Sequence, residues 1–478
     1  MDTKKLRQKI LDLAIRGKLV PQDPNDEPAS VLLERIRAEK EQLIKEGKIK
    51  RSKKSAATDK SHYENVPFEI PESWCWTSIG ELFEHNTGKA LNASNRDGKM
   101  MDYITTSNLY WDRFDLSVVK QMLFTEEELW RCTAKKGDLL ICEGGDIGRA
   151  AIWNYDYDIR IQNHIHRLRG YGGINHRFYY FVFLLYKLSN RIGGKGVAIQ
   201  GLSSGDLHKL EVPLPPECEQ IRLVKTIDKW FKFVDLLEQE QENLHSLAQS
   251  TKSKILGLAI SGKLVPQDPN DEPAIELLKR INPAFEPCDN SHYENLPQGW
   301  VKLRLGDVCS FERGITFPSS AKCTIKQPGL IACIRTANVQ DNLELDDLWY
   351  VGNEYIKGNT EKLIRKNDII MSSANSRELV GKVSYVQDIP EEMTFGGFVL
   401  NIRANEGILP FFLFLMLKTL YLKGYYLTIA TQTTNIANLN TKILGDIEVL
   451  LPPLTEQERI INSVTDILAS IENITVEL

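Results

Sequence analysis

Regularly spaced cysteines and long apolar runs are missing from this sequence. Its eight cysteines form no C-x-x-C pair and follow no fixed spacing, unlike those of zinc sites and disulfide-rich folds. We therefore expect reduced thiols and a cytoplasmic protein. The most apolar runs, 178–188 and 411–417, are too short to span a bilayer, and no signal peptide is recognisable. We expect no membrane association.

Motifs of common nucleic-acid enzymes are missing as well. There is no G-x-x-x-x-G-K-[ST] phosphate loop and no [DNS]-P-P-[FYW] tetrapeptide of the amino-methyltransferase type. His164 and His166 are too isolated to indicate a metal site, and we interpret them as partly buried histidines of a sheet. We therefore predict no catalytic residues and no metal ligands in this chain.

An excess of positive charge is also missing. The formal net charge is −5 over 478 residues, so a surface for nucleic acid must be local or must be shared with partner subunits. One basic stretch, 45–60, predicts a solvated linker, with an arm that contacts DNA phosphates as the alternative.

The sequence does contain one long element that is whole in the middle and divided between the two ends. Residues 13–29 reappear as 258–274 with a single substitution, and 451–457 match 214–220 in their Leu-Pro-Pro and Glu-Gln pairs. If the two ends of the chain meet, they rebuild a second copy of the central element. We therefore expect a pseudo-two-fold arrangement of two half-units.

The two blocks between these elements differ in most of their sequence, but several short motifs occur at corresponding positions in both. For example, 103–109 aligns with 333–339. Short β-rich runs separated by Gly, Asn and Asp predict strands and hairpins. The aromatic runs 178–188 and 411–422 predict one buried helix in each block. Each block is therefore expected to be α+β.

Helices are expected outside the blocks. Residues 3–16 place apolar side chains on one face and are followed by Gly17, a candidate C-cap. A second helix is expected from about 26–28 through Leu43. Between 217 and 260, apolar residues recur every three or four positions at Ile221, Val224, Ile227, Phe231, Val234, Leu237, Leu244, Leu247, Ile255 and Leu258.

This narrow apolar seam with polar flanks predicts a coiled-coil helix, about 66 Å long at 1.5 Å per residue. Ile460, Val464, Ile467 and Ile471 give the last helix a similar seam. Two such helices related by a two-fold axis would pack antiparallel and act as a spacer between the blocks. A frame of this kind matches a DNA target with two half-sites.

The permuted repeat, the GKLVPQDPNDEPA element and the Leu-Pro-Pro-x-x-Glu-Gln exits together resemble the specificity subunit of type I restriction–modification systems. The resemblance covers the whole chain. It implies an α+β fold of two pseudo-two-fold-related target-recognition domains, separated by long antiparallel helices that form a coiled-coil spacer. It further implies a non-catalytic subunit that binds double-stranded DNA and reads one half of a bipartite site with each domain.

The same resemblance implies partners and boundaries. The partners would be two modification (methyltransferase) subunits that methylate adenine and two restriction subunits that translocate and cleave DNA. No cofactor is expected on this chain; S-adenosylmethionine, ATP and Mg²⁺ are implied for the partners. The segments would be 1–60 (half repeat and linker), 61–213 (first target-recognition domain), 214–290 (central helical region), 291–450 (second domain) and 451–478 (half repeat).

Side chains that read bases must lie on turns inside the two blocks, with Arg or Lys suited to guanine and Asn or Gln to adenine. In the first block the candidates are Lys89, Asn92, Arg96, Thr105, Thr106, Arg149, Gln162, Asn163, Arg191, Lys195 and Gln200. In the second block they are Arg313, Arg335, Thr336, Ser373, Asn375, Arg377, Gln432, Thr433 and Asn435.

Some of these residues have a plainer interpretation. Asn108 and Asn338 occupy matching positions in two domains that should read different sequences, so we interpret them as hydrogen-bonding residues at strand ends. Arg335, aligned with Thr105, and the inserted loop 373–377 differ between blocks and are better candidates. Arg191 and Lys195 are expected to meet phosphates, which position a protein without specifying sequence.

The repeated Leu-Val-Pro-Gln-Asp-Pro-Asn-Asp-Glu-Pro-Ala element leaves two interpretations open. It either stiffens a turn or is a surface presented twice to two identical partners. On the second interpretation the partner-binding residues are Leu19, Val20, Pro21, Asp23 and Pro24, with Leu264, Val265, Pro266, Asp268 and Pro269.

Two other functions stay open. A stand-alone DNA-modifying enzyme or nuclease would act on DNA without partners, given magnesium or a methyl donor. A scaffold that binds only proteins would show no salt-sensitive, sequence-selective binding of DNA.

Overall fold

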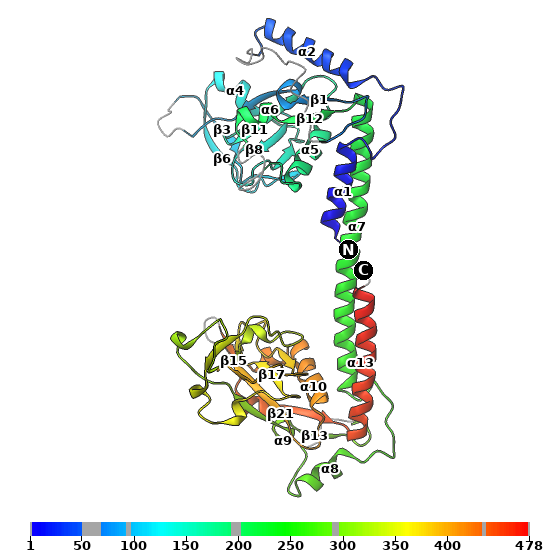
Figure 1. Cartoon of the computed structure of the whole chain (residues 1–478), viewed down its shortest axis with the longest axis vertical. Coiled ribbons are helices and arrows are strands. Elements are labelled where there is room, and N and C mark those ends of the chain that lie inside the picture. Colours follow the sequence, from blue (N-terminus) through cyan, green and yellow to red (C-terminus); the bar gives the residue numbers. More distant parts are fainter. Residues whose placement is uncertain are drawn as a thin grey trace. The chain divides into compact units, whose positions relative to one another are not determined.

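The computed structural model of this chain describes residues 2–49, 68–91, 97–192, 202–288, 296–432 and 436–476. Two compact units, Met1–Glu240 and Gln241–Leu478, divide the chain within one continuous helix, α7 (Glu217–Ala259) (Figure 1). Each unit therefore contains about half of α7, and each is described below by itself.

Unit 1 carries six further helices and twelve strands within its described residues. The helices are α1 (Thr3–Ile15), α2 (Ala29–Lys45), α3 (Ile79–Leu82), α4 (Glu126–Cys132), α5 (His176–Leu188) and α6 (Ser204–Lys209). The strands are β1 (Cys75–Ser78), β2 (Phe83–Thr87), β3 (Lys99–Ile104), β4 (Leu109–Tyr110), β5 (Arg113–Phe114), β6 (Lys120–Phe124), β7 (Thr133–Ala134), β8 (Leu139–Cys142), β9 (Ala150–Ile152), β10 (Ile159–Ile161), β11 (Ile165–Gly170) and β12 (Glu211–Leu214).

Unit 2 follows the same plan. Its further α-helices are α8 (Ala274–Ile281), α9 (Leu305–Val308), α10 (Pro410–Leu422), α11 (Tyr425–Ile429), α12 (Thr441–Gly445) and α13 (Leu454–Val476), with short 3₁₀ helices η2 (Ser319–Ala321), η3 (Thr336–Asn338), η4 (Asn353–Tyr355) and η5 (Thr360–Lys362). Its strands are β13 (Val301–Arg304), β14 (Cys309–Arg313), β15 (Leu330–Ile334), β16 (Trp349–Gly352), β17 (Ile369–Ser372), β18 (Ala374–Asn375), β19 (Val383–Tyr385), β20 (Met393–Phe395), β21 (Val399–Ala404), β22 (Thr431–Gln432), β23 (Ala437–Asn438) and β24 (Glu448–Leu451).

The two units have matching sheets. The order β2-β11-β8-β9 in unit 1 corresponds to β14-β21-β17-β19 in unit 2, and all of these pairs are antiparallel. A second sheet contains the parallel pair β3–β10 in unit 1 and β15–β20 in unit 2. The first and last strands of each block also pair, as β1–β12 and β13–β24. The α+β class is thus confirmed for both blocks.

One apolar helix fills the core of each unit. The aromatic runs fold as α5 and α10, which are buried over most of their lengths as predicted. In unit 1, α5 packs against β9 and α1. In unit 2, α10 packs against β19 and α13. Each block is therefore joined to its helical region by a shared hydrophobic core.

The predicted helix limits agree closely with the structure, and the predicted cap is present. α1 covers Thr3–Ile15, and Gly17 follows it with φ +67°. A Cβ at Gly17 would lie 2.4 Å from Pro71 Cγ, so both the left-handed backbone and the close approach require glycine there. Its counterpart, Gly262, also has φ +67° and packs against Pro297.

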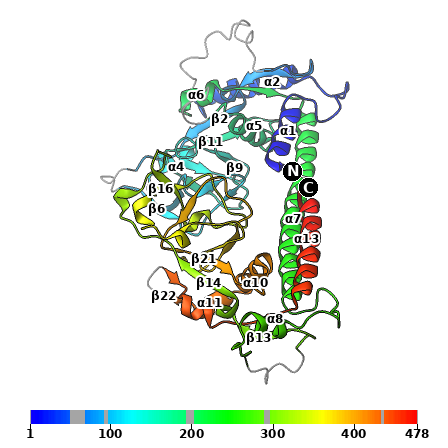
Figure 2. The same ribbon diagram turned by 60° about the horizontal axis from the view of Figure 1, so that its bottom comes forward.

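A terminal helix packs antiparallel on α7 in each unit. In unit 1, an Arg7 Nη2 atom lies 2.6 Å from Asp235 and 2.8 Å from Glu238, whereas Gln22, after α1, bonds Glu219 at the start of α7. In unit 2, Lys252 lies 3.2 Å from Glu472 on α13. Figures 1 and 2 both show α1 and α13 alongside α7.

The predicted apolar seam of α7 is correct only in part. Ile227 and Val234 are buried, but Ile221 and Leu237 are 56% and 40% exposed. In unit 2, Leu247 and Leu258 are also exposed, whereas Leu256 and Ala259 are buried. Each half of α7 meets one helix, α1 or α13, and the adjacent core, so that apolar residues on its other faces stay uncovered.

In both units a buried carboxylate connects three parts: the helix that follows the block, the start of the block, and the repeated turn. We call this connection the joint. The Trp74 indole donates to Glu219 at 2.8 Å, and the Trp300 indole donates to Glu456 at 3.0 Å. Gln22 and Gln267, in the repeated turn, donate to the same carboxylates. Burial raises the pKa of Glu219 and of Glu456 above the usual value for glutamate.

No helix in the described ranges has both the length and the apolar character that a membrane span requires.

Replacing Trp74 with Phe should destabilise unit 1, because a buried carboxylate loses a hydrogen-bond donor. We expect a loss of about 1–3 kcal/mol, beyond what removal of the indole area alone would cause. Trp76 is a matched control, because its Nε1 atom is buried and has no hydrogen-bond partner within the described residues. Hydrogen exchange across β1–β12 in the full chain measures the difference. Equal losses in Trp74→Phe and Trp76→Phe would contradict this role of Glu219.

Candidate nucleic-acid interface

Four segments meet at one end of the strands in unit 1. The Gln162 amide donates to the Ile104 carbonyl, and the Lys89 amide donates to Ile161, both at 3.0 Å. The Glu143 amide donates to the His164 carbonyl at 2.9 Å. We call these segments, 88–89, 104–108, 143–149 and 162–164, the unit 1 edge. Backbone hydrogen bonds hold the segments together, so their side chains can vary.

The unit 2 edge is built in the same way, from segments 314–315, 334–338, 372–377 and 396–398. The Ile315 amide donates to Phe395 and the Gly396 amide to Ile334, both at 2.8 Å. A Cβ at Gly314 would lie 2.1 Å from the Gly396 carbonyl oxygen. A Cβ at Gly88 would lie 2.0 Å from the Ile161 carbonyl oxygen. Glycine at these two positions therefore lets the segments approach each other.

Two candidates of the first block are buried in the unit 1 edge. Lys89 is 6% exposed, and its ammonium group bonds Glu128 at 2.6 Å and the Leu123 carbonyl at 2.8 Å. Thr105 is 7% exposed, and its hydroxyl bonds Ser107. Both side chains are therefore occupied within the domain, and Lys89 contributes to the support of the edge in this structure.

The other described candidates of the first block are half-buried. Arg149 stacks over Tyr110 and donates to the Thr106 carbonyl at 2.7 Å, which ties two segments of the edge together. Gln162 and Asn163 form the turn between β10 and β11. Arg191 lies after the C-terminal end of α5, next to Phe68 rather than on the turns.

In unit 2, a small sheet brings three candidates together. Asn375 on β18 and Gln432 on β22 both pair with Ala437 on β23. Ser373 precedes β18, and its hydroxyl donates to the Phe398 carbonyl at 3.0 Å. The inserted loop therefore lies against the turn between β20 and β21.

The arginines of the second block differ in whether they form an ion pair within unit 2. Arg335 forms an ion pair with Asp347 and stacks on Trp349, with Thr336 next to it in η3. Arg313 and Arg377 are exposed. Neither forms an ion pair with another residue that the structure describes, so both are available to a ligand.

Six candidates lie outside the described residues: Asn92, Arg96, Lys195, Gln200, Thr433 and Asn435. Most of the basic stretch 45–60 does as well.

Asn108 and Asn338 have the structural role that their matching positions predict. Asn108 accepts from the Thr105 amide at 2.9 Å and donates to the Asp115 and Val118 carbonyls. Asn338 accepts from the Arg335 amide at 2.9 Å and donates to Glu344 and Asp347. Each side chain closes the loop after a strand, which confirms the interpretation.

The interpretation of His164 as a partly buried sheet histidine is wrong, and the exposed Phe398 was not among the candidates. His164 in unit 1 and Phe398 in unit 2 each directly precede the last strand of the sheet, β11 and β21. The His164 side chain is 57% exposed, and Phe398 is 64% exposed. Two chemically different side chains thus occupy one position of a shared framework. The available signal was the alignment of Gln-Asn-His with Gly-Gly-Phe.

His166, by contrast, is a fully buried sheet histidine in a cluster with His85 and His208. Its Nε2 atom donates to the Leu202 carbonyl at 2.7 Å, so its Nδ1 atom must accept from His85 Nε2 at 2.9 Å. Burial lowers the pKa of all three, that of His85 to about 3. In the described part of the chain, no group of three or more potential ligands could hold a metal ion.

The repeated turn element has both inward and outward residues. Asp26 pairs with Arg222, and Asp271 pairs with Arg459, on the helix that follows each block. Leu19 and Val20 pack against the core of unit 1, as Leu264 and Val265 pack in unit 2. The exposed members are Pro21, Asp23 and Pro24, with Pro266, Asp268 and Pro269. Each copy thus stiffens a joint and presents the same outer surface.

An exposed apolar face lies on the unit 1 half of α7. Trp230 and Phe233 are 48% and 46% exposed, with ring centroids 6.0 Å apart, and Leu237 follows one turn later. Large exposed apolar clusters of this kind are typical of protein–protein contacts.

Comparisons with known proteins agree on one family. A model described as "Type I restriction modification DNA specificity domain" matches residues 71–246 and again 297–478. The EcoAI specificity subunit of Escherichia coli is 27% identical over 547 aligned residues, which cover 97% of this chain and 89% of that protein. The EcoEI specificity subunit of Escherichia coli is 26% identical, over 97% of this chain and 88% of that protein.

A solved structure described as "Structural basis underlying complex assembly and conformational transition of the type I R-M system" has a similar fold. Its TM-score is 0.53 at 19% identity, over 86% of this chain and 95% of that one.

The histidine cluster should make unit 1 sensitive to acid. Because the folded pKa of His85 lies below the unfolded value of 6.5, the cluster stabilises unit 1 above pH 6.5, and this contribution is lost as pH falls toward 3. In that window His85 costs about 1.4 kcal/mol of stability per pH unit, because the unfolded chain binds a proton that the folded chain does not.

Hydrogen exchange in the full chain at pH 7.5 and 5.5 tests this expectation. Unit 2 is an internal control, because Phe311, Leu400 and Gly445 stand where unit 1 has the three histidines. His85→Phe should weaken the acid sensitivity of β11. Equal acid sensitivity of β11 and β21 would contradict the prediction.

Proposed function

Because this chain belongs to the type I restriction–modification DNA specificity family and is a specificity subunit of such a system, we propose that each unit reads one half of a bipartite duplex site. Unit 1 would read through its edge and unit 2 through the corresponding edge. The resulting complex would direct adenine methylation, and restriction where a nuclease subunit is present, to that site.

One observation carries this proposal: the two units share an edge framework but differ in the side chains that the framework presents. The shared parts are backbone hydrogen bonds, two close glycine contacts and the buried Asn108 and Asn338. The exposed side chains that differ are His164 in unit 1 and Phe398 in unit 2. At the position of the buried Thr105, unit 2 has Arg335, which pairs with Asp347. A constant frame with variable side chains suits two domains that recognise different sequences.

The chemistry of these side chains suits base edges in a major groove. Amides such as Gln162 and Gln432 can pair with adenine, and a free arginine such as Arg377 can pair with guanine. Phe398 offers an apolar contact for the methyl group of thymine. The net charge of −5 means that much of the attraction to phosphates must come from local clusters or from partners.

We further propose that the chemistry belongs to partner subunits. Two modification subunits would bind S-adenosylmethionine and methylate adenine, and two restriction subunits would use ATP and Mg²⁺ to translocate and cleave DNA. The two identical outer surfaces of the repeated turn element support a partner that is present in two copies. The exposed Trp230, Phe233 and Leu237 support docking of a partner helix on α7.

Exchange of one block tests the division of labour between the units. Replacing residues 61–213 with the equivalent block of a relative should change one half of the methylated site and leave the other half unchanged. Mapping methylated adenines across the genome, in cells that carry the chain and its partners, gives the result. A change in both halves of the site would contradict the proposal that each unit reads its own half. Loss of all methylation by a complex that still assembles would contradict it as well.

Phe398→Ala should relax recognition at one position in the half-site of unit 2. Loss of an apolar contact to a base should cost about 1–3 kcal/mol of discrimination at that base pair. Binding of the complex to duplexes with single base-pair substitutions measures this effect. Ile325→Ala is the matched control, since Ile325 is 69% exposed in the same unit but lies in the loop before β15. An unchanged preference after Phe398→Ala would exclude a reading role.

A further inference from the structure

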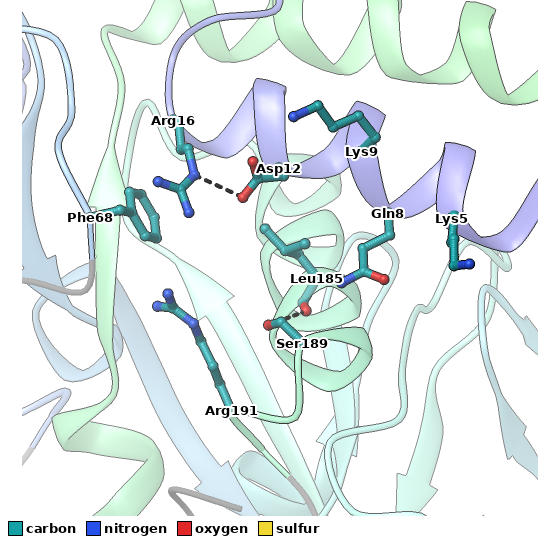
Figure 3. A pocket seen from close by; sticks show the side chains of 9 residues that line it. All are labelled: Lys5, Gln8, Lys9, Asp12, Arg16, Phe68, Leu185, Ser189 and Arg191. Atoms are coloured by element: carbon teal, nitrogen blue, oxygen red, sulfur yellow. Dashed lines mark hydrogen bonds and ion pairs between the residues drawn. The ribbon is translucent and has the colours of Figure 1, made fainter.

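A basic cavity lies in unit 1 between α1 and the C-terminal end of α5. Its volume is about 290 Å³, and four cationic side chains line it: Lys5, Lys9, Arg16 and Arg191. Asp12 is the only acidic residue among its described lining residues. Figure 3 shows the side chains that line the cavity, with Arg16 and Arg191 both close to Phe68.

The positive charge of this cavity is not neutralised inside the domain. Asp12 is already bonded to Arg16 Nε at 2.7 Å, and Lys5 lies 3.3 Å from Asp2. Lys9 and Arg191 form no ion pair with any residue in the described ranges. Lys9 is exposed and Arg191 is half-buried, so both can reach a ligand.

The ring of Phe68 contacts the guanidinium groups of both Arg16 and Arg191. The Cζ atoms of Arg16 and Arg191 lie 4.9 Å and 5.2 Å from the centroid of its ring (Figure 3). Cation–π contacts position each group, and they place two like charges within about 5 Å of one ring centroid. An anion between them would relieve the repulsion, and a phosphate group, with several acceptor oxygens, matches the donor geometry of guanidinium groups.

The corresponding place in unit 2 carries fewer charged side chains. In the repeat, Lys5, Asp12 and Arg16 are replaced by Ser250, Gly257 and Ser261, whereas Lys254 retains a cation and Lys423 stands where unit 1 has Ser189. Asn190 and Gly424 both have positive φ just after α5 and α10, which aligns Arg191 with Tyr425. A joint that folds without these charges in unit 2 does not need them for folding in unit 1.

The cavity is connected to the unit 1 edge through the end of α5. Lys187 lies 2.8 Å from Asp146 and donates to the Ile147 carbonyl at 3.0 Å, and Ile192 packs against Gly148. Arg191 is therefore next to the segment 143–149. A phosphate bound there would lie close to the bases that this edge reads.

We propose that this cavity binds a phosphate group, and that in the assembled complex the group belongs to the DNA backbone beside the half-site of unit 1. The DNA assignment rests on the function proposed above. Because phosphate contacts position a duplex without specifying its sequence, the cavity adds affinity on one side of the site only.

Salt dependence of DNA binding by the assembled complex tests the proposal. In the double variant Lys9→Gln/Arg191→Gln, the slope of log K against log salt should become shallower by about one to two, with the same preferred site. Arg191→Lys in place of Arg191→Gln should restore part of the slope. Lys254→Gln is the control, since Lys254 occupies the position of Lys9 in unit 2, and the substitution should leave the slope unchanged.

Thermal unfolding of the full chain with added inorganic phosphate separates the two sources of the ligand. Wild type should be stabilised by phosphate more than the double variant. If this difference is seen but the DNA salt slope is unchanged, the cavity takes a free phosphate compound and the DNA assignment is overturned. If neither differs, the phosphate site itself is overturned. A wild-type complex without any preferred site would instead refute the proposed function.

Discussion

A buried carboxylate at the start of a helix holds each unit together. Glu219 and Glu456 are 1% and 0% exposed, and each accepts hydrogen bonds from a tryptophan of its block and from a glutamine of the repeated turn. A buried carboxylate that loses such partners is costly. The helix, the turn and the first strand of the block must therefore stay together, and this constraint explains why both copies retain Leu-Pro-Pro-x-x-Glu-Gln and the glutamine of the turn.

The rigid joint leaves the opposite end of each block free to diverge. The edge segments are tied by backbone amides and carbonyls, and by Asn108 and Asn338, which close equivalent loops. Side chains at positions such as His164 and Phe398 contribute little to this frame and are exposed. One fold can therefore carry two recognition surfaces, because stability and recognition depend on different atoms.

The sequence predicted the helices well because their signals are local or repeated. Gly17, the aromatic run of α5 and the length of α7 all follow from periodicity and capping. It predicted the edge residues less well, because exposure depends on partners far along the chain. Lysine is a residue type that often contacts DNA, but Lys89 bonds Glu128. Phenylalanine is typical of a hydrophobic core, but Phe398 is exposed. The prediction that Ile221 and Leu237 lie in a buried seam of α7 is wrong, because periodicity does not show which face of the helix its partner helix covers.

The distribution of charge connects these observations. A protein with a net charge of −5 does not attract DNA through its overall field, so any attraction must arise where cations lack local partners. Many cations of the described residues are paired within their own unit; Arg169 with Asp138 and Arg403 with Asp368 are equivalent examples. Arg313 and Arg377 in unit 2, with Lys9 and Arg191 in unit 1, are among the described cations that form no such pair. Unpaired cations near each edge would orient a duplex locally, and under the proposed function the remaining attraction would have to come from partner subunits.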